Sequence, residues 1–291
     1  MANSSPRQPF AKRPGAERPG AKRPRPRPRA KPDPVRAWVN RLRRYRPDLM
    51  ADTLATLRTM YGTPTWQRVH DPTSELVLTM LSANSADINA ERAFDLLCQR
   101  WPPMASAANE AGVVSRPGWG GKGIAESGAD WAAVEFADLG ELVDVIRPGG
   151  LANQKAPRIQ AALRHIREQR GDYSLEFLGD MSPADALAWL TQVNGIGRKT
   201  ASVVLLFSFG MALMPVDRHI ERVSKRIGLI PPRATAEQAH DLLQAQLATD
   251  QVHQAHVNLI THGRQTCHAL RPECLRCAIA PRCRYLEPKA L

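Results

Sequence analysis

The sequence predicts an all-α fold, and three features of the chain point to it. Apolar residues recur at helical spacing in almost every segment that follows the proline-rich start. No segment makes a convincing β-strand. The longest mostly apolar run, residues 201–216, is interrupted by Ser202, Ser208 and Gly210. It is too short to cross a bilayer comfortably and is typical of a buried helix followed by a turn.

Helix boundary signals divide the chain into a series of expected helices. Pro47 separates the first two, and Ser182-Pro183 supplies an N-cap followed by proline at the first helical position of another. Residues 102–130 are rich in Gly, Pro, Ala and Ser, which predicts a long loop or insertion. The expected helices are Val35–Tyr45, Leu49–Tyr61, Ser74–Ser82, Ala86–Arg100, Leu139–Ile146, Asn153–Gln169, Ser174–Leu178, Pro183–Val193, Gly197–Phe209, Asp217–Ile227, Thr235–Ala248 and Gln251–Gly263.

The first 34 residues differ from the rest of the chain. They hold ten of the 40 Lys and Arg residues and nine of the 24 prolines, against two acidic residues. Such a proline density excludes regular helix and sheet, so we expect residues 1–34 to form a disordered basic tail. The tail lacks the apolar core of a signal peptide, and its prolines would break the helix of a transit peptide. A phosphate-binding arm, a solubilising tail and a misassigned start codon all remain open.

The net charge of +12 suggests a polyanionic partner, but its distribution limits that inference. The tail contributes +8, so the remainder of the chain carries only +4. The folded part is therefore mildly basic. A nucleic-acid partner has to be argued from motifs.

Four of the five cysteines lie close together near the C-terminus. Cys267, Cys274, Cys277 and Cys283 have the spacing C-x6-C-x2-C-x5-C. Thiolates separated by short loops are ligands for zinc or for iron–sulfur clusters. Disulfides are not expected without a secretion signal, and only one of the two short C-x2-4-C pairs usual in zinc sites is present. We expect an iron–sulfur cluster, with structural zinc as the alternative, and we interpret the isolated Cys98 as a core residue.

A glycine turn, V-N-G-I-G-R-K-T-A, joins two expected helices at residues 193–201. Glycine lets the backbone approach another chain closely, and a helix N-terminus offers free N–H groups to phosphate. This combination predicts a helix–hairpin–helix grip on the DNA backbone that does not read bases. A nucleotide P-loop is excluded, because only one residue separates Gly195 from Gly197 and Arg198 precedes Lys199.

Four motifs occur together in this part of the chain: G-x-G-R-K-T-A, V-D-R-H-I at 216–220, H-G-R-x-T-C at 262–267 and the cysteine spacing. With them, residues 49–291 resemble the endonuclease III family of DNA glycosylases. The resemblance implies two helical domains with DNA bound between them, and a [4Fe–4S] cluster held by the four cysteines.

The resemblance also implies domain boundaries. A helical barrel containing the hairpin is expected at residues 72–213. A cluster domain is expected to combine residues 35–71 with residues 214–291.

The resemblance assigns roles to five residues of this chain. Lys199 falls on the family's catalytic lysine and Asp217 on its catalytic aspartate. Leu151, in G-L-A-N-Q-K-A, falls on the residue that wedges into the duplex where the damaged nucleotide is extruded. Asn84 replaces a glutamine that fills the vacated space, and Asp87 matches a polar residue that lines the base pocket.

Further DNA contacts are expected from the hairpin and from the cysteine segment. Gly195, Gly197, Arg198 and Thr200 belong to the hairpin, and Arg271 lies in the loop between the first two cysteines. A phosphate contact is the expected role of each.

Three departures from the family pattern are visible. Asn194 replaces the proline before G-x-G, which the turn should tolerate. Asn84-Ser85-Ala86 replaces the usual Gln-Ala-Thr, and the 102–130 loop is longer than is typical. The last two leave the lysine and the cysteines intact but leave the base specificity open.

The chemistry expected of Lys199 is nucleophilic. A helix N-terminus, the neighbouring Arg198 and partial desolvation each disfavour the ammonium, so a free amine is expected to be available. The amine would attack C1′ of the sugar, expel the base and leave a Schiff base, and β-elimination would then nick the strand. Asp217 would accept a proton or stabilise positive charge, although it could be only an N-cap. His219 is expected to be structural or a phosphate contact rather than a base.

The function implied by the resemblance is base excision repair by a bifunctional DNA N-glycosylase and AP lyase that removes oxidised pyrimidines. Two alternatives remain open. One is a monofunctional mismatch or uracil glycosylase, against which Lys199 argues, and the other is a non-catalytic DNA-damage-binding module. The expected partner is double-stranded DNA with damaged bases or abasic sites, bound by a cytoplasmic, nucleoid-associated monomer that does not contact a membrane.

Overall fold

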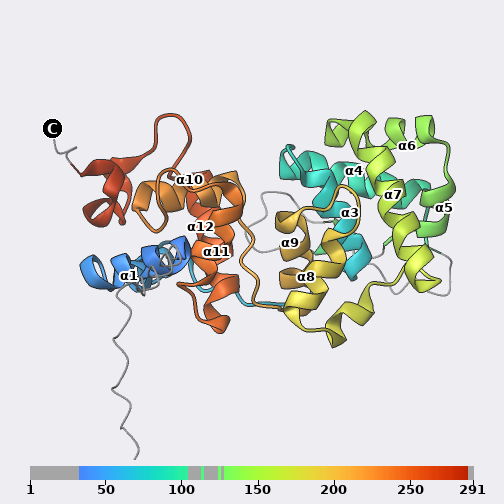
Figure 1. The fold of residues 1–291 in the computed structure, drawn as a ribbon. Coiled ribbons are helices and arrows are strands. Elements are labelled where there is room, and N and C mark those ends of the chain that lie inside the picture. The colour runs from blue at the N-terminus through green and yellow to red at the C-terminus, as the bar shows by residue number, and fades with distance from the viewer. Residues whose placement is uncertain (1–32, 104–112, 115–123, 126–127, 288–291) are drawn as a thin grey trace, which may run out of the picture. The chain divides into compact units, whose positions relative to one another are not determined.

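The computed structural model describes residues 33–103, 113–114, 124–125 and 128–287 (Figure 1). The expected basic tail, apart from its last two residues, and most of the 102–130 loop lie outside the described residues. No helix in the described part is long and apolar enough to span a bilayer.

Helices dominate the described residues, as the sequence predicts (Figure 1). The α-helices are α1 (Pro34–Tyr45), α2 (Leu49–Tyr61), α3 (Pro72–Ser82), α4 (Asp87–Arg100), α5 (Trp131–Phe136), α6 (Leu139–Ile146), α7 (Ala152–Arg170), α8 (Pro183–Thr191), α9 (Arg198–Phe209), α10 (Arg218–Ile227), α11 (Ala236–Gln244) and α12 (Val252–Gln265). The short 3₁₀ helices are η1 (Arg147–Gly149), η2 (Glu176–Asp180), η3 (Thr249–Gln251), η4 (Cys274–Arg276), η5 (Ala280–Arg282) and η6 (Arg284–Leu286).

Most predicted helices differ from the structure by one or two residues at an end, and the helix predicted at Thr235–Ala248 is α11, which ends at Gln244. Helices α2 and α6 have the predicted bounds, whereas the helix expected at Ser174–Leu178 is the 3₁₀ helix η2. Helix α5 was not predicted, because it directly follows the Gly- and Pro-rich segment. The expectation of no strand is wrong at one point, since β1 (Val113–Val114) pairs antiparallel with β2 (Ile124–Ala125) inside that segment.

The buried apolar side chains form two clusters. One combines residues of α3 to α8 with Ala201, Val204 and Leu205 of α9. The other combines residues of α2, α10, α11 and α12 with Val203 and Leu206 of α9.

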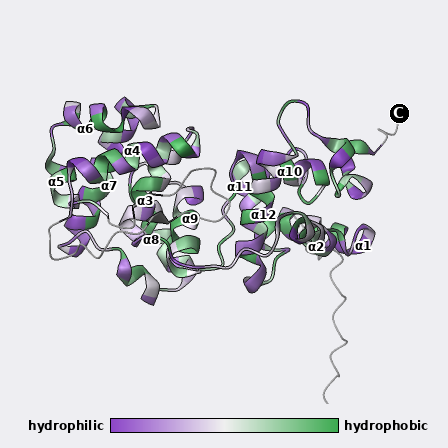
Figure 2. Ribbon diagram, turned by 180° about the vertical axis from the view of Figure 1, so that it is seen from behind, coloured by the Kyte–Doolittle hydropathy of each residue, from purple (hydrophilic) through white to green (hydrophobic). Residues whose placement is uncertain are grey.

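Helix α9 therefore contributes to both clusters from opposite sides, which explains why its sequence is apolar on almost every face (Figure 2). Helix α9 is therefore packed on both sides from Ala201 onward, directly after its first turn.

A buried carboxylate fastens α5 to the long helix α7. The Glu135 side chain is fully buried and accepts hydrogen bonds at 2.8 Å from Nε and Nη2 of Arg167. The Tyr173 hydroxyl donates a further bond to Glu135 at 2.7 Å. The hydrogen bonds from Arg167 hold the pKa of Glu135 below its ordinary value.

We expect Glu135→Gln to lower the free energy of unfolding by about 1–3 kcal/mol, because charge-assisted hydrogen bonds to a buried group are lost. The pKa of Glu135 is depressed in the folded state. The stability that its carboxylate contributes is therefore present above its ordinary pKa and disappears as the pH falls through the folded value. Urea unfolding at neutral and acidic pH measures both effects, with the exposed Glu168→Gln on α7 as the matched control. A difference between variant and wild type that stays constant with pH would contradict this account.

Candidate active-site cavity

A cavity of about 310 Å³ lies at the N-terminal end of α9. Lys199 and Thr200 line it from the first turn of α9, and Asp217 lines it from the residue before α10. Asn84 and Asp87 line it from the turn between α3 and α4 and from the start of α4. Five residues singled out in the sequence, from three separate segments, thus surround one space.

The glycine turn sets the backbone conformation directly before α9. Gly195 has φ +90°, a conformation that favours glycine, and a Cβ there would lie 3.4 Å from the Arg158 side chain. Gly197 is the N-cap of α9, and a Cβ added to it would meet no atom within 4 Å. Ile196 is buried between the two glycines and anchors the turn. The backbone N–H groups of the first turn of α9 are therefore presented beside an open surface, as an anion-binding helix terminus requires.

Asp217 has a structural role in addition to its place at the cavity. Its Oδ1 accepts a hydrogen bond from the Ile220 backbone N–H at 2.8 Å, so Asp217 is the N-cap of α10. The cap fixes the carboxylate beside the cavity that Lys199 also lines. The two roles considered for Asp217 are geometrically compatible.

Arg198 differs from what the sequence suggested. Its guanidinium pairs with Glu237 at 2.8 Å and with Asp241 at 2.5 Å, both on α11. Its charge is therefore balanced by two carboxylates of the protein. This pairing weakens the expectation that Arg198 disfavours the ammonium of Lys199, and it ties the first turn of α9 to α11.

Asn84 and Leu151 also line a smaller cavity of about 70 Å³, together with Gly195 and Thr200. Leu151 precedes α7, and the residue is 48% exposed. Leu151 is therefore not part of the buried core. The glycine turn and the two candidate duplex-entering residues are neighbours.

Arg264 was not predicted as a site residue. It lies on α12, lines the large cavity and forms an ion pair with Asp87 in which Nη1 and Oδ2 are 2.7 Å apart. The pair joins the start of α4 to α12. The available signal was the arginine of the H-G-R-x-T-C motif, whose partner lies far away in the sequence.

His219 also lines the cavity, and its Nδ1 lies 3.2 Å from the Arg222 guanidinium.

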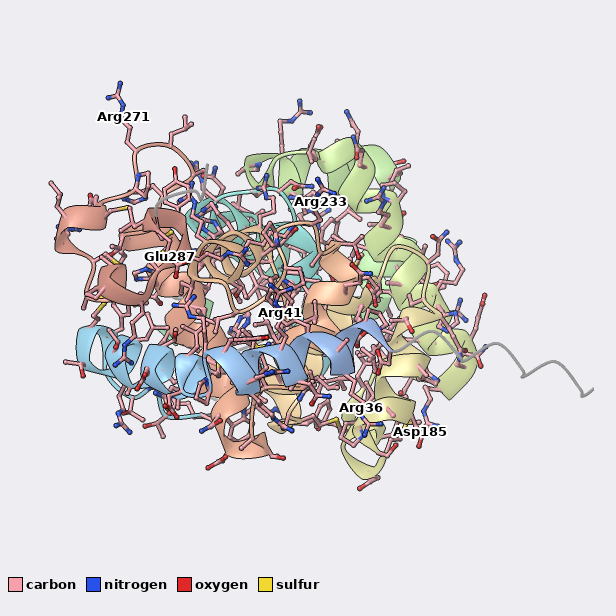
Figure 3. The ribbon with its side chains drawn as sticks, turned by 60° about the vertical axis from the view of Figure 1, so that its left-hand side comes forward. Arg36, Arg41, Asp185, Arg233, Arg271 and Glu287 are labelled. Carbon is pink, nitrogen blue, oxygen red and sulfur yellow. The ribbon has the colours of Figure 1, made fainter. Side chains whose placement is uncertain are left out.

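Arg271 stands apart from these residues. It projects into solvent from the loop that follows α12 (Figure 3), and its φ is +51°. It does not line the large cavity.

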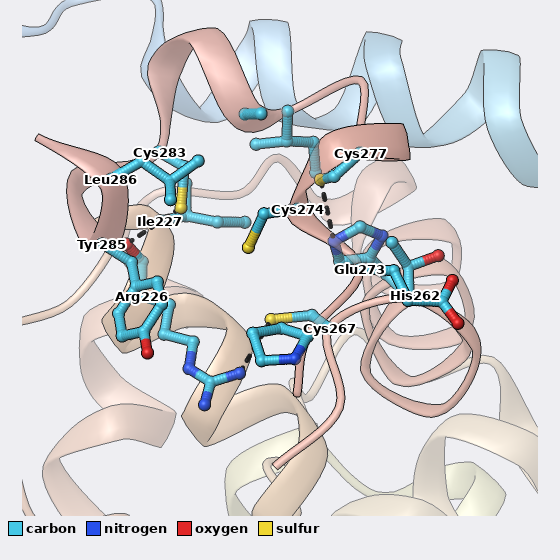
Figure 4. Close-up of a pocket in the computed structure, with 14 residues that line it drawn as sticks. Arg226, Ile227, His262, Cys267, Glu273, Cys274, Cys277, Cys283, Tyr285 and Leu286 are labelled. Carbon is cyan, nitrogen blue, oxygen red and sulfur yellow. Dashed lines mark hydrogen bonds between the residues drawn. The ribbon is translucent and has the colours of Figure 1, made fainter. Parts of the chain in front are cut away.

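The four clustered cysteines line a second cavity (Figure 4). Arg226 donates from Nη1 to the Cys267 sulfur at 3.4 Å, and the Cys283 thiol donates to the Arg226 carbonyl at 3.3 Å. The Cys277 sulfur lies 3.7 Å from Nε2 of His262. Burial lowers the pKa of His262 to about 4, so this ring is neutral at physiological pH.

The composition of this second cavity suits a thiolate-bound metal centre. Four free thiols face one space, and a guanidinium beside them offsets the negative charge of thiolate ligands. Among the described residues, no three His, Cys, Asp or Glu side chains are grouped as a single metal ion requires. Cys98 is buried in α4, as predicted, and burial raises the pKa of its thiol to about 12.

Comparison with known proteins identifies the family to which this chain belongs. Residues 77–249, more than half of the chain, match the HhH-GPD superfamily of base excision DNA repair proteins. The chain belongs to this superfamily. Endonuclease III of Synechocystis sp. is 30% identical over 213 residues, which cover 73% of this chain and 80% of that protein. This similarity confirms the resemblance to the endonuclease III family.

Other relatives of this HhH-GPD chain match over shorter parts. Endonuclease III of Sulfolobus acidocaldarius is 32% identical over 152 residues, which cover 52% of this chain. The chain spans 66% of the length of that protein and 9% of the length of Protein ROS1C of Oryza sativa subsp. japonica. A solved structure of a trapped endonuclease III–DNA covalent intermediate has a TM-score of 0.63 at 24% identity, and covers 81% of this chain and 94% of that one. This likeness confirms the predicted all-α, helix–hairpin–helix glycosylase fold.

Proposed function

We propose that this chain is a bifunctional DNA N-glycosylase and AP lyase that acts in base excision repair. The observation that carries the proposal is that Lys199 and Asp217 line one cavity at the N-terminal end of α9, beside the glycine turn. An amine, a carboxylate and a helix terminus are the parts that a lyase needs for a nucleophile, a proton acceptor and a phosphate grip. The match to a superfamily of base excision DNA repair proteins supports the same pathway.

The reaction begins with extrusion of the damaged nucleotide into the large cavity, which is easiest for a poorly stacked, oxidised pyrimidine. The Lys199 amine attacks C1′ of the sugar, and the bond to the base breaks with its electron pair leaving on the base. The C1′–O4′ bond of the sugar then breaks, O4′ takes a proton, and the Lys199 nitrogen forms a Schiff base with C1′. Loss of a proton from C2′ expels the 3′ phosphate, which leaves with the electron pair of its bond to C3′. Asp217 accepts a proton from the attacking amine or stabilises positive charge at the sugar.

The grip on DNA follows from the same elements. Gly195, Gly197 and Thr200 lie at the N-terminus of α9, where backbone N–H groups can bind a phosphate oxygen. Arg271 is exposed and free to reach a phosphate. Arg198 contributes less, because it would have to exchange its ion pairs with α11 for the phosphate.

Lesion recognition is assigned to three other residues. Asn84 and Leu151 enter the duplex, and Asp87, held by Arg264, lines the pocket for the extruded base. The substrate is double-stranded DNA that carries a damaged base or an abasic site.

The two apolar clusters support the expected division into domains. Residues 72–213 would form the barrel with the hairpin, and residues 35–71 and 214–291 the second domain. We infer that Cys267, Cys274, Cys277 and Cys283 hold a [4Fe–4S] cluster in that second domain. The cluster's bonds to four thiolates would cross-link the C-terminal segment.

The test uses labelled duplexes that carry one oxidised pyrimidine, one uracil opposite guanine or one abasic site, with an undamaged duplex as control. We expect nicking of the abasic and oxidised-pyrimidine duplexes without heat or alkali. Base release that gives a nick only after alkali would support the monofunctional alternative. Tight binding to the abasic duplex without any nick would support the non-catalytic module, and either result would overturn the lyase.

A further inference from the structure

Two loops beside the glycine turn share an unusual backbone conformation. Asn84 has φ +56° and Leu151 has φ +53°, in the left-handed region that residues with a Cβ rarely occupy. Leucine lacks the short polar side chain that makes this conformation tolerable for asparagine. Such residues persist only where their surroundings fix them, and they concentrate at functional sites.

The group that joins these loops is the buried side chain of Lys155. It lies in the first turn of α7, and only 5% of the residue is exposed. Its ammonium donates to the Leu81 carbonyl at 2.5 Å, to the Ser85 hydroxyl at 2.8 Å and to the Gly149 carbonyl at 2.8 Å. Leu81 and Ser85 flank the Asn84 loop, and Gly149 lies two residues before Leu151, so one side chain holds both loops.

Ser85 closes the connection. Its hydroxyl accepts from Lys155 and donates to the Gly149 carbonyl, so the two loops are also linked directly. Ser85 stands where the family pattern Gln-Ala-Thr has alanine, which has no hydroxyl. The direct link is therefore a property of this chain's own sequence.

Close packing prevents the loops from separating sideways. A Cβ on Gly149 would lie 3.0 Å from the Cβ of Ala93, and one on Gly150 would lie 3.4 Å from the Ser85 hydroxyl. The backbone of the second loop is thus pressed against α4 and against Ser85.

The chemistry of Lys155 fits three neutral acceptors. An ammonium has three N–H bonds, and each has a partner here. The Leu81 carbonyl belongs to the last turn of α3, where the helix dipole favours a cation. Burial lowers the pKa of Lys155 to about 8, which reflects the cost of keeping this ammonium away from water.

We propose that Lys155 and Ser85 are positioning residues that hold the Asn84 loop and the Leu151 loop at one fixed spacing, so that both side chains enter the duplex together. This inference rests on the proposed function. It deepens that function, because it assigns the joint entry of Asn84 and Leu151 into the duplex, where the damaged nucleotide is extruded, to a hydrogen-bonded clamp formed by Lys155 and Ser85. In this proposal Lys199 carries out the reaction, and the clamp fixes the spacing of the Asn84 and Leu151 loops, which matters only when the substrate is double-stranded.

The experiment compares the rate of borohydride trapping on an abasic duplex with the rate on the same abasic strand alone. A single strand has no opposite base to separate, so trapping on it needs Lys199 but not the paired loops. Lys155→Met keeps most of the length of the side chain and removes its donors, and Gln169→Met on the exposed face of α7 is the matched control. We expect Lys155→Met to lower the duplex-to-single-strand ratio about tenfold, because buried acceptors lose their partner.

Substitutions of Ser85 test the proposal independently, in the same trapping assay, even if Lys155→Met fails to fold. We expect Ser85→Ala to lower the ratio about threefold, since both bonds of its hydroxyl are lost while Lys155 keeps its bonds to the Leu81 and Gly149 carbonyls, and Ser85→Thr to restore it. The double variant should be no worse than Lys155→Met alone, because both residues act through one network.

Two results overturn the inference in distinguishable ways. If the duplex-to-single-strand ratio is unchanged in Lys155→Met and Ser85→Ala, or if the trapping rate falls equally on both substrates, the clamp proposal is wrong and the proposed function is unaffected. Failure of the wild-type protein to trap either substrate overturns the proposed function, and the clamp falls with it.

Discussion

We expect Lys199→Gln to abolish borohydride trapping and strand nicking on an abasic duplex while much of the affinity for that duplex remains. A glutamine amide cannot form a Schiff base, so the trapped adduct falls to background. Lys199 is one residue in a cavity that several segments line, and losing one contact costs roughly 1 kcal/mol, so the affinity should fall by no more than about tenfold.

The measurement is denaturing gel electrophoresis of the trapped adduct, together with a titration of a fluorescent abasic-analogue duplex. Lys225→Gln is the matched control, because Lys225 lies on α10 in an ion pair with Glu221 and does not line the cavity. A trapped adduct in Lys199→Gln would place the nucleophile elsewhere and leave Lys199 as a phosphate contact.

The position of Lys199 was visible in the sequence because the signals around it are local. A cation in the first turn of a helix is disfavoured by the helix dipole, so its presence there called for an explanation. The two glycines before it mark the turn within a few residues. Local signals of this kind, with proline and N-cap residues, also gave α2 and α6 their bounds.

Contacts between distant segments were not visible in the same way. Arg198 pairs with Glu237 and Asp241, and Arg264 pairs with Asp87, across long stretches of chain. Charged residues on amphipathic helices are usually solvated, and nothing in their spacing identifies a partner on another element. The sequence therefore predicted the residues around Lys199 and missed the ion pairs that hold them.

Helices without local signals were missed for a related reason. Helix α5 is only six residues long and begins just after the Gly- and Pro-rich segment. Its stability comes from tertiary packing and from the bonds of Glu135 to α7, not from the propensity of its own residues. Periodicity cannot reveal an element that its neighbours stabilise.

The second prediction with a large expected effect concerns the [4Fe–4S] cluster. Between Cys267 and Leu286 the described chain has only three short 3₁₀ helices, η4, η5 and η6. Short 3₁₀ turns contribute few backbone hydrogen bonds. Leu270 and Leu275 are 85% and 108% exposed, so this segment also buries little apolar surface. We expect the order of this segment to depend on what the four cysteines bind, in addition to the buried Ile279 and the hydrogen bonds from Arg226 to the His268 and Ala269 carbonyls.

We therefore expect anaerobically purified protein to be brown, with about four irons per chain, and Cys277→Ser to lose colour, iron and thermal stability together. Binding to thiolates and folding of such a segment are one process, so removing a ligand removes both. Cys98→Ser is the matched control: it changes a buried thiol of α4 that is not near the other four, so stability should fall while the iron remains. Iron analysis, visible absorption and a melting curve on each protein measure these effects. Colourless wild-type protein with one stoichiometric zinc would contradict the iron–sulfur assignment, because the same four thiols would then hold a single ion.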